Sequence, residues 1–263
     1  MGYGAPLASA SRYETLGAAT GVGTPVTSGA SVNTFGSTIT LGTTSFDYDG
    51  IFITAASTGN NINLVDIIVN TGGSDQIIVT TVPVPHNSGG GIYQSTSGVI
   101  PVSIPAGAVV KAKMQSETAS AIADLMVVGF QGNNNQSPGF RGLACCTDIT
   151  SGAPTNGLTM SSTTQTAWVQ IQASTANRIA GLYWSYDTRG TTAGATQVLL
   201  QVGWGPSGSE KLLFTAGLNF SMMPVLQGPY PCDLPAGTRL AARMQASGTV
   251  TQTVSILLHG LIA

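Results

Sequence analysis

An internal repeat constrains the fold of this chain more than any other feature. The segment 104–115, IPAGAVVKAKMQ, is matched by the segment 234–245, LPAGTRLAARMQ, which begins about 130 residues later. The two segments share Pro-Ala-Gly near the start, an alanine in the middle and Met-Gln at the end. Most of the other positions are similar in size or charge. The match predicts that one fold occurs twice along the chain.

Two further pairs of segments occur in the same order. GSDQIIV at 73–79 corresponds to GSEKLLF at 208–214, and GIFI at 50–53 corresponds to GLYW at 181–184. The spacing differs by only a few residues among the three pairs, and loops accommodate insertions of that size at small cost. Three anchors therefore support the duplication.

Both copies have the pattern of β-strands joined by turns. Each contains runs of roughly four to eight residues rich in β-branched and aromatic side chains, separated by Gly, Pro, Asn and Ser. Helix signals are nearly absent, with no long stripe of period 3.6. In both repeats Pro-Ala-Gly is typical of a turn in which the glycine takes a positive φ. The pattern predicts an all-β fold of two tandem, duplicated β-sandwich domains of jelly-roll type.

Composition marks four regions. Residues 1–34 are rich in Gly, Ala, Ser and Thr, and we expect an extended N-terminal arm that is either frayed or ordered against a neighbouring subunit. We expect the first β-sandwich at 35–132 and the second at 158–263. The stretch between them, 133–157, contains Asn, Gly and Pro clusters and is the expected linker.

Charged residues make up only 8% of the chain, against about 25% in an average soluble protein. The net charge of −2 creates no field that would attract nucleic acid or an anionic membrane. No apolar run approaches the roughly 20 residues of a spanning helix, so we expect no membrane insertion. A surface with so few charges suits a subunit that is packed against its neighbours.

Residues suited to catalysis or metal binding are few. The two histidines, His86 and His259, occupy non-matching positions of the two copies, and no G-x-S-x-G elbow occurs. Asp47 and Asp49 could place two carboxylates on one face of a strand, but the second copy lacks the pair and Asp is common in turns. We therefore predict no catalytic, cofactor or metal site, no cofactor, and no enzymatic activity.

The three cysteines leave several arrangements open. Cys145 and Cys146 are adjacent, which is a strained arrangement for a mutual disulfide. A bridge from this pair to Cys232, a bridge between subunits and free thiols all remain compatible with the sequence.

Two groups of residues are candidates for contact with a ligand or a partner. The first is a set of basic residues on the equivalent strands of the repeat: Lys111, Lys113, Arg239 and Arg243. Residues two or four apart point to one face of a strand, and we expect salt bridges at a sheet edge or an interface. The second group is aromatic and lies in the second copy: Trp168, Trp184, Trp204 and Tyr183. Exposed rings would form a shelf for sugars, whereas buried rings would be core.

On these motifs the chain resembles the small tandem-β-sandwich virion proteins of tailed bacteriophages. The resemblance rests on GTPVTSGA at 23–30, on the repeated Ile/Leu-Pro-Ala-Gly and Met-Gln signature, and on the low-charge, Thr/Gly-rich composition. It covers nearly the whole chain. It implies a virion location, other virion proteins as partners, no cofactor, and a homo-oligomer in which a trimer is favoured.

The sequence and the resemblance indicate two candidate functions. The first is a structural subunit of a phage virion, as a capsid decoration or cement protein, a spike or a tail component. The alternative is a carbohydrate-binding module of a phage fibre that recognises host-surface glycans. Burial of Trp184 and Trp204 favours the structural role, whereas an exposed, coplanar pair favours sugar binding.

Overall fold

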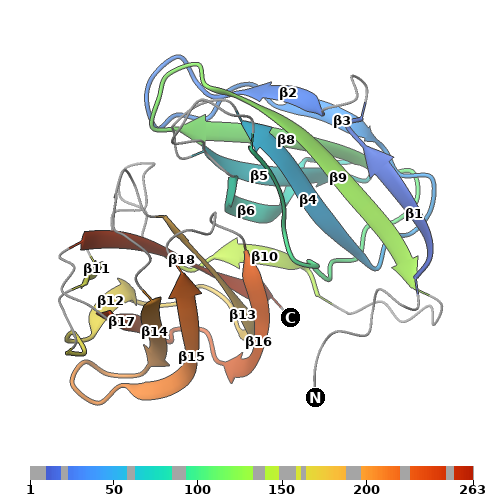
Figure 1. The fold of residues 1–263 in the computed structure, drawn as a ribbon. Coiled ribbons are helices and arrows are strands. Elements are labelled where there is room, and N and C mark those ends of the chain that lie inside the picture. The colour runs from blue at the N-terminus through green and yellow to red at the C-terminus, as the bar shows by residue number, and fades with distance from the viewer. Residues whose placement is uncertain are drawn as a thin grey trace. The chain divides into compact units, whose positions relative to one another are not determined.

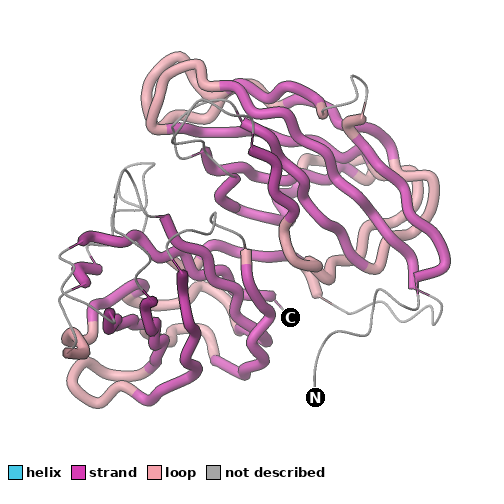
Figure 2. The backbone as a smooth tube through the Cα atoms, viewed as in Figure 1, coloured by secondary structure: helices cyan, strands magenta, loops and turns pink. Residues whose placement is uncertain are grey.

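The computed structural model describes residues 10–18, 23–57, 63–84, 93–132, 140–147, 158–160, 164–187, 197–219, 226–246 and 252–262. These residues form strands, turns and loops, and no helix that could span a membrane occurs among them (Figure 2). The chain divides into two compact units, with the boundary between Ala144 and Cys145. The predicted all-β sandwich class is confirmed.

Unit 1 contains two sheets (Figure 1). The first has the order β1–β9–β4–β7, with β2 also paired to β9: β1 (Ala10–Leu16), β2 (Thr24–Thr27), β4 (Gly50–Ser57), β7 (Tyr93–Thr96) and β9 (Ile122–Gly132). The second has the order β3–β8–β5–β6: β3 (Ile39–Thr43), β5 (Asn63–Asn70), β6 (Gln76–Val84) and β8 (Val109–Ser116). The short β10 (Gly142–Cys145) pairs in parallel with β6 through Leu143. Ile51, Met114 and Leu125, which come from both sheets, are fully buried.

Unit 2 also contains two sheets. The first has the order β16–β13–β18, with β11 paired to β18: β11 (Leu158–Met160), β13 (Ile179–Asp187), β16 (Gln227–Leu234) and β18 (Gln252–Ile262). The second has the order β12–β17–β14–β15: β12 (Val169–Gln172), β14 (Gln197–Trp204), β15 (Lys211–Asn219) and β17 (Leu240–Ala246). Side chains from both sheets, among them Trp184, Leu200 and Met244, form one hydrophobic core.

The two units repeat one arrangement of strands. The sheet β3–β8–β5–β6 of unit 1 corresponds to β12–β17–β14–β15 of unit 2, and the pair β4–β9 corresponds to β13–β18. An irregularity in pairing also recurs, between Thr40 and Gly42 in β3 and between Gln170 and Gln172 in β12. A bulge kept at the same place in two divergent copies is a feature of the fold, because bulges set the local bend of a strand.

The Pro-Ala-Gly turn of unit 1 is held by a single threonine. Gly107 has a φ of +78°, as the sequence predicts. The Thr44 hydroxyl donates to the carbonyl of Pro105 at 2.7 Å and accepts from the N–H of Ala108 at 3.0 Å. The backbone of Thr44 bonds Gly107 and Ala108 as well. We call this arrangement the threonine clamp.

Unit 2 contains the same clamp. Gly237 has a φ of +85°. The Thr175 hydroxyl donates to the carbonyl of Pro235 at 3.3 Å and accepts from the N–H of Thr238 at 3.1 Å. The backbone of Thr175 bonds Gly237 and Thr238. The repeated sequence motif therefore builds the same hydrogen-bonded turn twice.

The described part of the expected N-terminal arm belongs to unit 1. Both β1 and β2 pair with β9, and Val26 is completely buried. The Glu14 carboxylate accepts from the Tyr48 hydroxyl at 2.6 Å and from the N–H of Ser45 at 2.9 Å. These contacts explain why residues 10–18 and 23–34 are not a separate extension, although their composition suggested one. Residues 1–9 lie outside the described part.

The strands β7 and β16 are not marked in the sequence by a run of β-branched residues. The strand β16 contains Pro229 and Pro231 and runs at the edge of its sheet, next to β13 alone. Edge positions tolerate proline because one side of the strand needs no ladder hydrogen bonds.

Candidate functional site

The predicted basic residues lie on interior strands. Lys111 and Lys113 belong to β8, which runs between β3 and β5, and Arg239 and Arg243 flank or belong to β17, which runs between β12 and β14 (Figure 1). The expectation that they protect a sheet edge is therefore wrong. They point away from the buried side of each strand, because successive side chains of a strand alternate between its faces.

One basic residue in each unit ties a hairpin turn to the neighbouring strand. In unit 1 the Lys111 ammonium lies 2.8 Å from Asp75. In unit 2 the Arg239 guanidinium lies 2.9 Å from Glu210, at the corresponding turn. The hydrogen bond from Lys111 lowers the pKa of Asp75. Burial acts to raise the pKa of Glu210, but the hydrogen bonds and charge of its partners outweigh this effect and the pKa is lowered.

A large apolar side chain is exposed beside each of these turns. Ile77 is 47% exposed at the start of β6, and Leu212 is 52% exposed at the start of β15. The two residues occupy the same position of the repeat, two residues after Asp75 and Glu210. Most exposed apolar residues need no explanation, but a pair retained at equivalent positions of two divergent copies indicates a shared use.

Further along the same face, unit 1 has a buried ion pair. Asp66 of β5 is 3% exposed, lies 3.3 Å from the Lys113 ammonium, and accepts from the N–H of Thr81 at 2.8 Å. The ammonium also stands 4.3 Å above the centre of the Phe35 ring. Burial raises the pKa of Asp66 although Thr81 and Lys113 act to lower it. Every charge of this cluster has a partner.

The corresponding cluster of unit 2 has a different composition. Gln201 and Arg243 are direct neighbours across β14 and β17, as Asp66 and Lys113 are across β5 and β8. The Arg243 Nε donates to the Gln201 Oε1 at 2.8 Å, and its guanidinium carbon lies 4.3 Å from the centre of the Trp168 ring. An amide thus replaces the carboxylate, and an indole replaces the phenyl ring.

The structure divides the predicted aromatic group. Trp184 and Tyr183 are completely buried, and burial raises the pKa of the Tyr183 hydroxyl. Trp204 is partly buried against the core of unit 2, and Trp168 is partly exposed on the opposite face of the sheet. Because Trp184 is in the core, an exposed pair formed by Trp184 and Trp204 is not present. Phe214 and Tyr230 form a stacked pair at 4.1 Å that the sequence analysis did not single out.

The other candidate side chains have structural roles. Asp47 accepts from the N–H of Ala106 and Asp49 from the N–H of Gly132, each at 2.7 Å. Both carboxylates thus fix backbone rather than face each other. Among the described residues no group of three His, Cys, Asp or Glu side chains is placed to hold a metal ion.

All three cysteines are free thiols. Burial raises the pKa of Cys146 to about 12 and that of Cys232 to about 11. Both thiols are therefore protonated and unreactive at neutral pH, since the thiolate is the reactive form.

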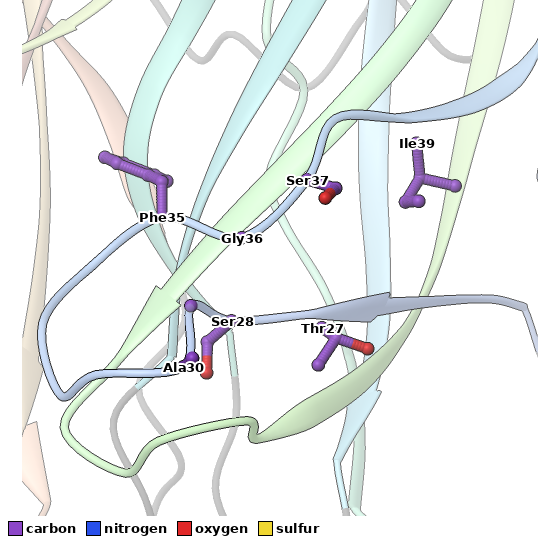
Figure 3. Close-up of a pocket in the computed structure, with 8 residues that line it drawn as sticks. Thr27, Ser28, Ala30, Phe35, Gly36, Ser37 and Ile39 are labelled. Atoms are coloured by element: carbon purple, nitrogen blue, oxygen red, sulfur yellow. The ribbon is translucent and has the colours of Figure 1, made fainter.

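A groove of about 590 Å³ opens on unit 1 beside the end of β2 (Figure 3). The segment that leads into β3 forms its other wall. It is lined by Thr27, Ser28, Gly29, Ala30, Phe35, Gly36, Ser37 and Ile39. None of these side chains titrates near neutral pH, and none was predicted as a site residue. The groove can therefore accommodate a partner but offers no acid, base or nucleophile with an activating group.

No protein-family model matches the chain, and no curated protein matches it. Among solved structures the chain is similar to PNGF-II, with a TM-score of 0.40, 10% identity, and coverage of 96% of this chain and 65% of that one. It thus spans about two thirds of the length of PNGF-II. It is also similar to the STIV major capsid protein, with a TM-score of 0.42, 9% identity, and coverage of 94% and 95%. For N-glycanase F the TM-score is 0.38, the identity 12%, and the coverage 95% and 96%.

At these values the similarity concerns the β-sandwich fold alone. The glycanase structures nevertheless contradict the prediction that the protein has no enzymatic activity, and we withdraw that prediction. The STIV protein is a viral structural β-sandwich, and a virion location for this chain is a proposal. An origin in a tailed bacteriophage remains a proposal.

Proposed function

We propose that this chain is a structural subunit of a phage virion, as a capsid decoration or cement protein, a spike or a tail component. In this proposal each unit contacts a neighbouring subunit through the hairpin that carries its exposed apolar residue. The observation that carries the proposal is the equivalent exposure of Ile77 and Leu212. Full burial of an exposed side chain of this size contributes about 1.5–3 kcal/mol, and roughly half of that is still to be gained at an interface because each residue is already about half buried.

The surroundings of these residues support an interface. Each lies beside an ion pair that fixes the hairpin, Asp75 with Lys111 in unit 1 and Glu210 with Arg239 in unit 2. A rigid turn loses less conformational entropy on binding than a mobile one. The low charge of the whole chain, 8% of residues, also reduces repulsion between packed copies. A homo-oligomer, with a trimer favoured, and other virion proteins are the partners we propose.

Light scattering of the full chain across a dilution series tests this proposal. We expect a trimer or larger species, and we expect the double variant Ile77→Lys, Leu212→Lys to dissociate at concentrations where the parent is assembled. The matched control is Ile122→Lys in β9. Ile122 is 53% exposed, but the corresponding residue of unit 2 is Thr253. A monomer at every concentration, or equal dissociation of the control, contradicts the proposal.

A further inference from the structure

The sheet β12–β17–β14–β15 of unit 2 has one face turned away from the core. On β14 the core side is formed by Val198, Leu200 and Val202. Alternation therefore places Leu199, Gln201 and Gly203 on the other face, with Arg243 directly opposite Gln201. The Trp168 ring covers this face at Gly203, where a Cβ atom would meet its Cη2 at 2.8 Å. Leu199 is 39% exposed and Leu212 52% exposed on the same face.

Polar groups lie along the same sheet as the indole, and several of them are bonded to Gln201 or Arg239. Gln201 Oε1 accepts from Arg243 and from Gln165, and Gln201 Nε2 lies 3.5 Å from the Thr215 hydroxyl. In β12, which begins directly after Trp168, the Gln170 Oε1 accepts a hydrogen bond from the Arg239 Nε at 3.0 Å. Amides both donate and accept hydrogen bonds, as sugar hydroxyls do. An aromatic ring provides the flat apolar surface against which the C–H face of a pyranose packs.

Arg243 gives this face an uncompensated positive charge. Its Nε is bonded to Gln201 and its guanidinium is stacked on Trp168, whereas its Nη1 and Nη2 have no acceptor among the described residues. No carboxylate in the described part of the chain pairs with it. The nearby Arg239 is neutralised by Glu210. The two Nη groups of an arginine form the fork that binds a carboxylate in bidentate geometry.

The equivalent place in unit 1 lacks these properties. In unit 1 the basic residue, Lys113, is already paired with the Asp66 carboxylate. The position that corresponds to Gly203 is occupied by Ile68. Ile68 is only 4% exposed. The second copy has thus exchanged a closed ion pair for an open cation with an indole beside it. Both changes add binding capacity and neither is required by the fold, since unit 1 folds without them.

We infer that the face formed by Trp168, Gln201 and Arg243 binds a carbohydrate that bears a carboxylate, such as a sialic or uronic acid residue. Trp168 stacks on the sugar ring, the Arg243 Nη groups bind the carboxylate, and Gln165, Gln170 and Thr215 meet hydroxyls. Trp and Arg are also enriched at protein interfaces, so a protein partner is the alternative outcome that the experiment must separate from glycan binding. This inference goes beyond the structural role and does not depend on it.

The test begins with labelled full-length protein on an array that pairs sialylated, uronic-acid and uncharged glycans of matched length. The strongest ligand is then titrated calorimetrically beside its carboxyl methyl ester. We expect binding to the carboxylate form and about tenfold weaker binding to the ester, because a charge-assisted hydrogen bond is lost. Binding to the carboxylate form also weakens as salt is raised.

Variants assign the effect to residues. Arg243→Gln abolishes the preference for the acid over the ester, and Arg243→Lys retains a reduced preference because lysine lacks the planar fork. Trp168→Ala weakens binding to both forms. Arg178→Gln removes an equal charge from unit 2 and serves as the matched control with unchanged affinity, because Arg178 pairs with Asp233 and with no described residue of this face. Thermal melting of each variant confirms that it is folded.

Three results overturn the inference. One is the absence of binding to every glycan on the array, and another is equal affinity for the acid and the ester. The third is a change in oligomer mass when Arg243 or Trp168 is substituted, in a protein whose parent binds no glycan. That result would identify this face as a protein interface. Because Leu212 lies on the same face, the structural role is tested by the oligomer mass of the Ile77 and Leu212 variants, and the glycan site is tested by the glycan affinity of the Arg243 and Trp168 variants. The two proposals therefore fail on different readouts.

Discussion

The same location of the repeat has different side-chain contacts in the two units. In unit 1, Asp66 and Lys113 form a buried ion pair beneath the Phe35 ring. In unit 2, Gln201 and Arg243 occupy the same register beside Trp168. The backbone is equivalent, down to the bulge between Gln170 and Gln172 and its counterpart in β3. Divergence after duplication has therefore changed the outer face and left the framework intact.

This comparison separates what the fold requires from what it permits. The threonine clamps recur with the same donors and acceptors, although Thr44 and Thr175 lie outside the three sequence anchors. The hydroxyls of Thr44 and Thr175 are buried and must find hydrogen-bond partners in both copies, so the clamp is retained. An exposed face has no such requirement, and its residues are available for binding.

We expect the largest loss of stability on replacing a glycine whose missing Cβ leaves room for a neighbouring side chain. A Cβ at Gly129 would lie 2.0 Å from the Tyr48 ring, whereas a Cβ at the equivalent Gly260 would lie 2.7 Å from the end of Ile179. A ring yields less than the end of an aliphatic chain. We expect Gly129→Ala to lower the free energy of unfolding by about 3 kcal/mol or more and Gly260→Ala by about 1–2 kcal/mol.

Chemical denaturation followed by hydrogen exchange of β9 and β18 measures both glycine variants. Exchange in each strand assigns the loss to its own unit. Equal losses in the two units would show that Tyr48 relaxes as readily as Ile179.

We expect a smaller loss of stability when the hydroxyl of a threonine clamp is removed. Thr44→Val keeps the shape of the side chain but leaves the N–H of Ala108 and the carbonyl of Pro105 without the hydroxyl. We expect a loss of about 1–3 kcal/mol, and a smaller loss for Thr175→Val because its bond to Pro235 is longer, at 3.3 Å. Denaturation midpoints of the two variants provide the measurement. Thr43→Val is the control, since Thr43 is exposed on β3; a loss in the control equal to that of Thr44→Val contradicts the clamp.

The smallest expected effect is a change in the pH dependence of stability. Burial raises the pKa of Asp66 in the folded chain, so the folded state holds this proton more tightly than the unfolded state. The contribution of Asp66 to stability is therefore full below its ordinary pKa of about 3.9 and is lost as pH rises through the raised pKa. Asp66→Asn removes this dependence. Gln201, its counterpart in unit 2, does not ionise and adds no pH dependence to stability.

Denaturation midpoints of the parent and of Asp66→Asn, measured from about pH 3.5 to 7, test this sign. We expect the difference between the two curves to change over the window in which Asp66 ionises. Parallel curves would show that Asp66 is not more basic in the folded state. Asp75, whose pKa is lowered by Lys111, contributes with the opposite sign and is present in both proteins.

The repeat made most of the fold predictable. The three anchors carry β4, β6 and β8 and their counterparts, and the positive φ of Gly107 and Gly237 followed from the Pro-Ala-Gly motif. The strands β1 and β2 were missed because both lie in a stretch rich in Gly, Ala and Ser, and because β2 is short and contains Pro25. They are held by pairing with β9, which is a tertiary effect that composition does not reveal.

The candidate site was predictable in its residues but not in its partners. Alternation indicates that one of two neighbouring side chains faces inward, yet Tyr183 and Trp184 are both completely buried. Similarly, Lys113 and Arg243 were identified from their spacing, but their partners Asp66 and Gln201 come from another strand. Register determines such pairs, and a single sequence does not specify register until the turns are placed.

The confinement of Trp168, Trp184 and Trp204 to unit 2 makes the protein optically asymmetric. Selective excitation of indole reports on one half of the molecule, while unit 1 is silent apart from its tyrosines and phenylalanines. Within that half the signal comes from a fully buried ring, a half-buried one and a partly exposed one stacked on a cation. An unmodified sample therefore has its own spectroscopic label, with which unfolding of the second copy can be followed without a dye.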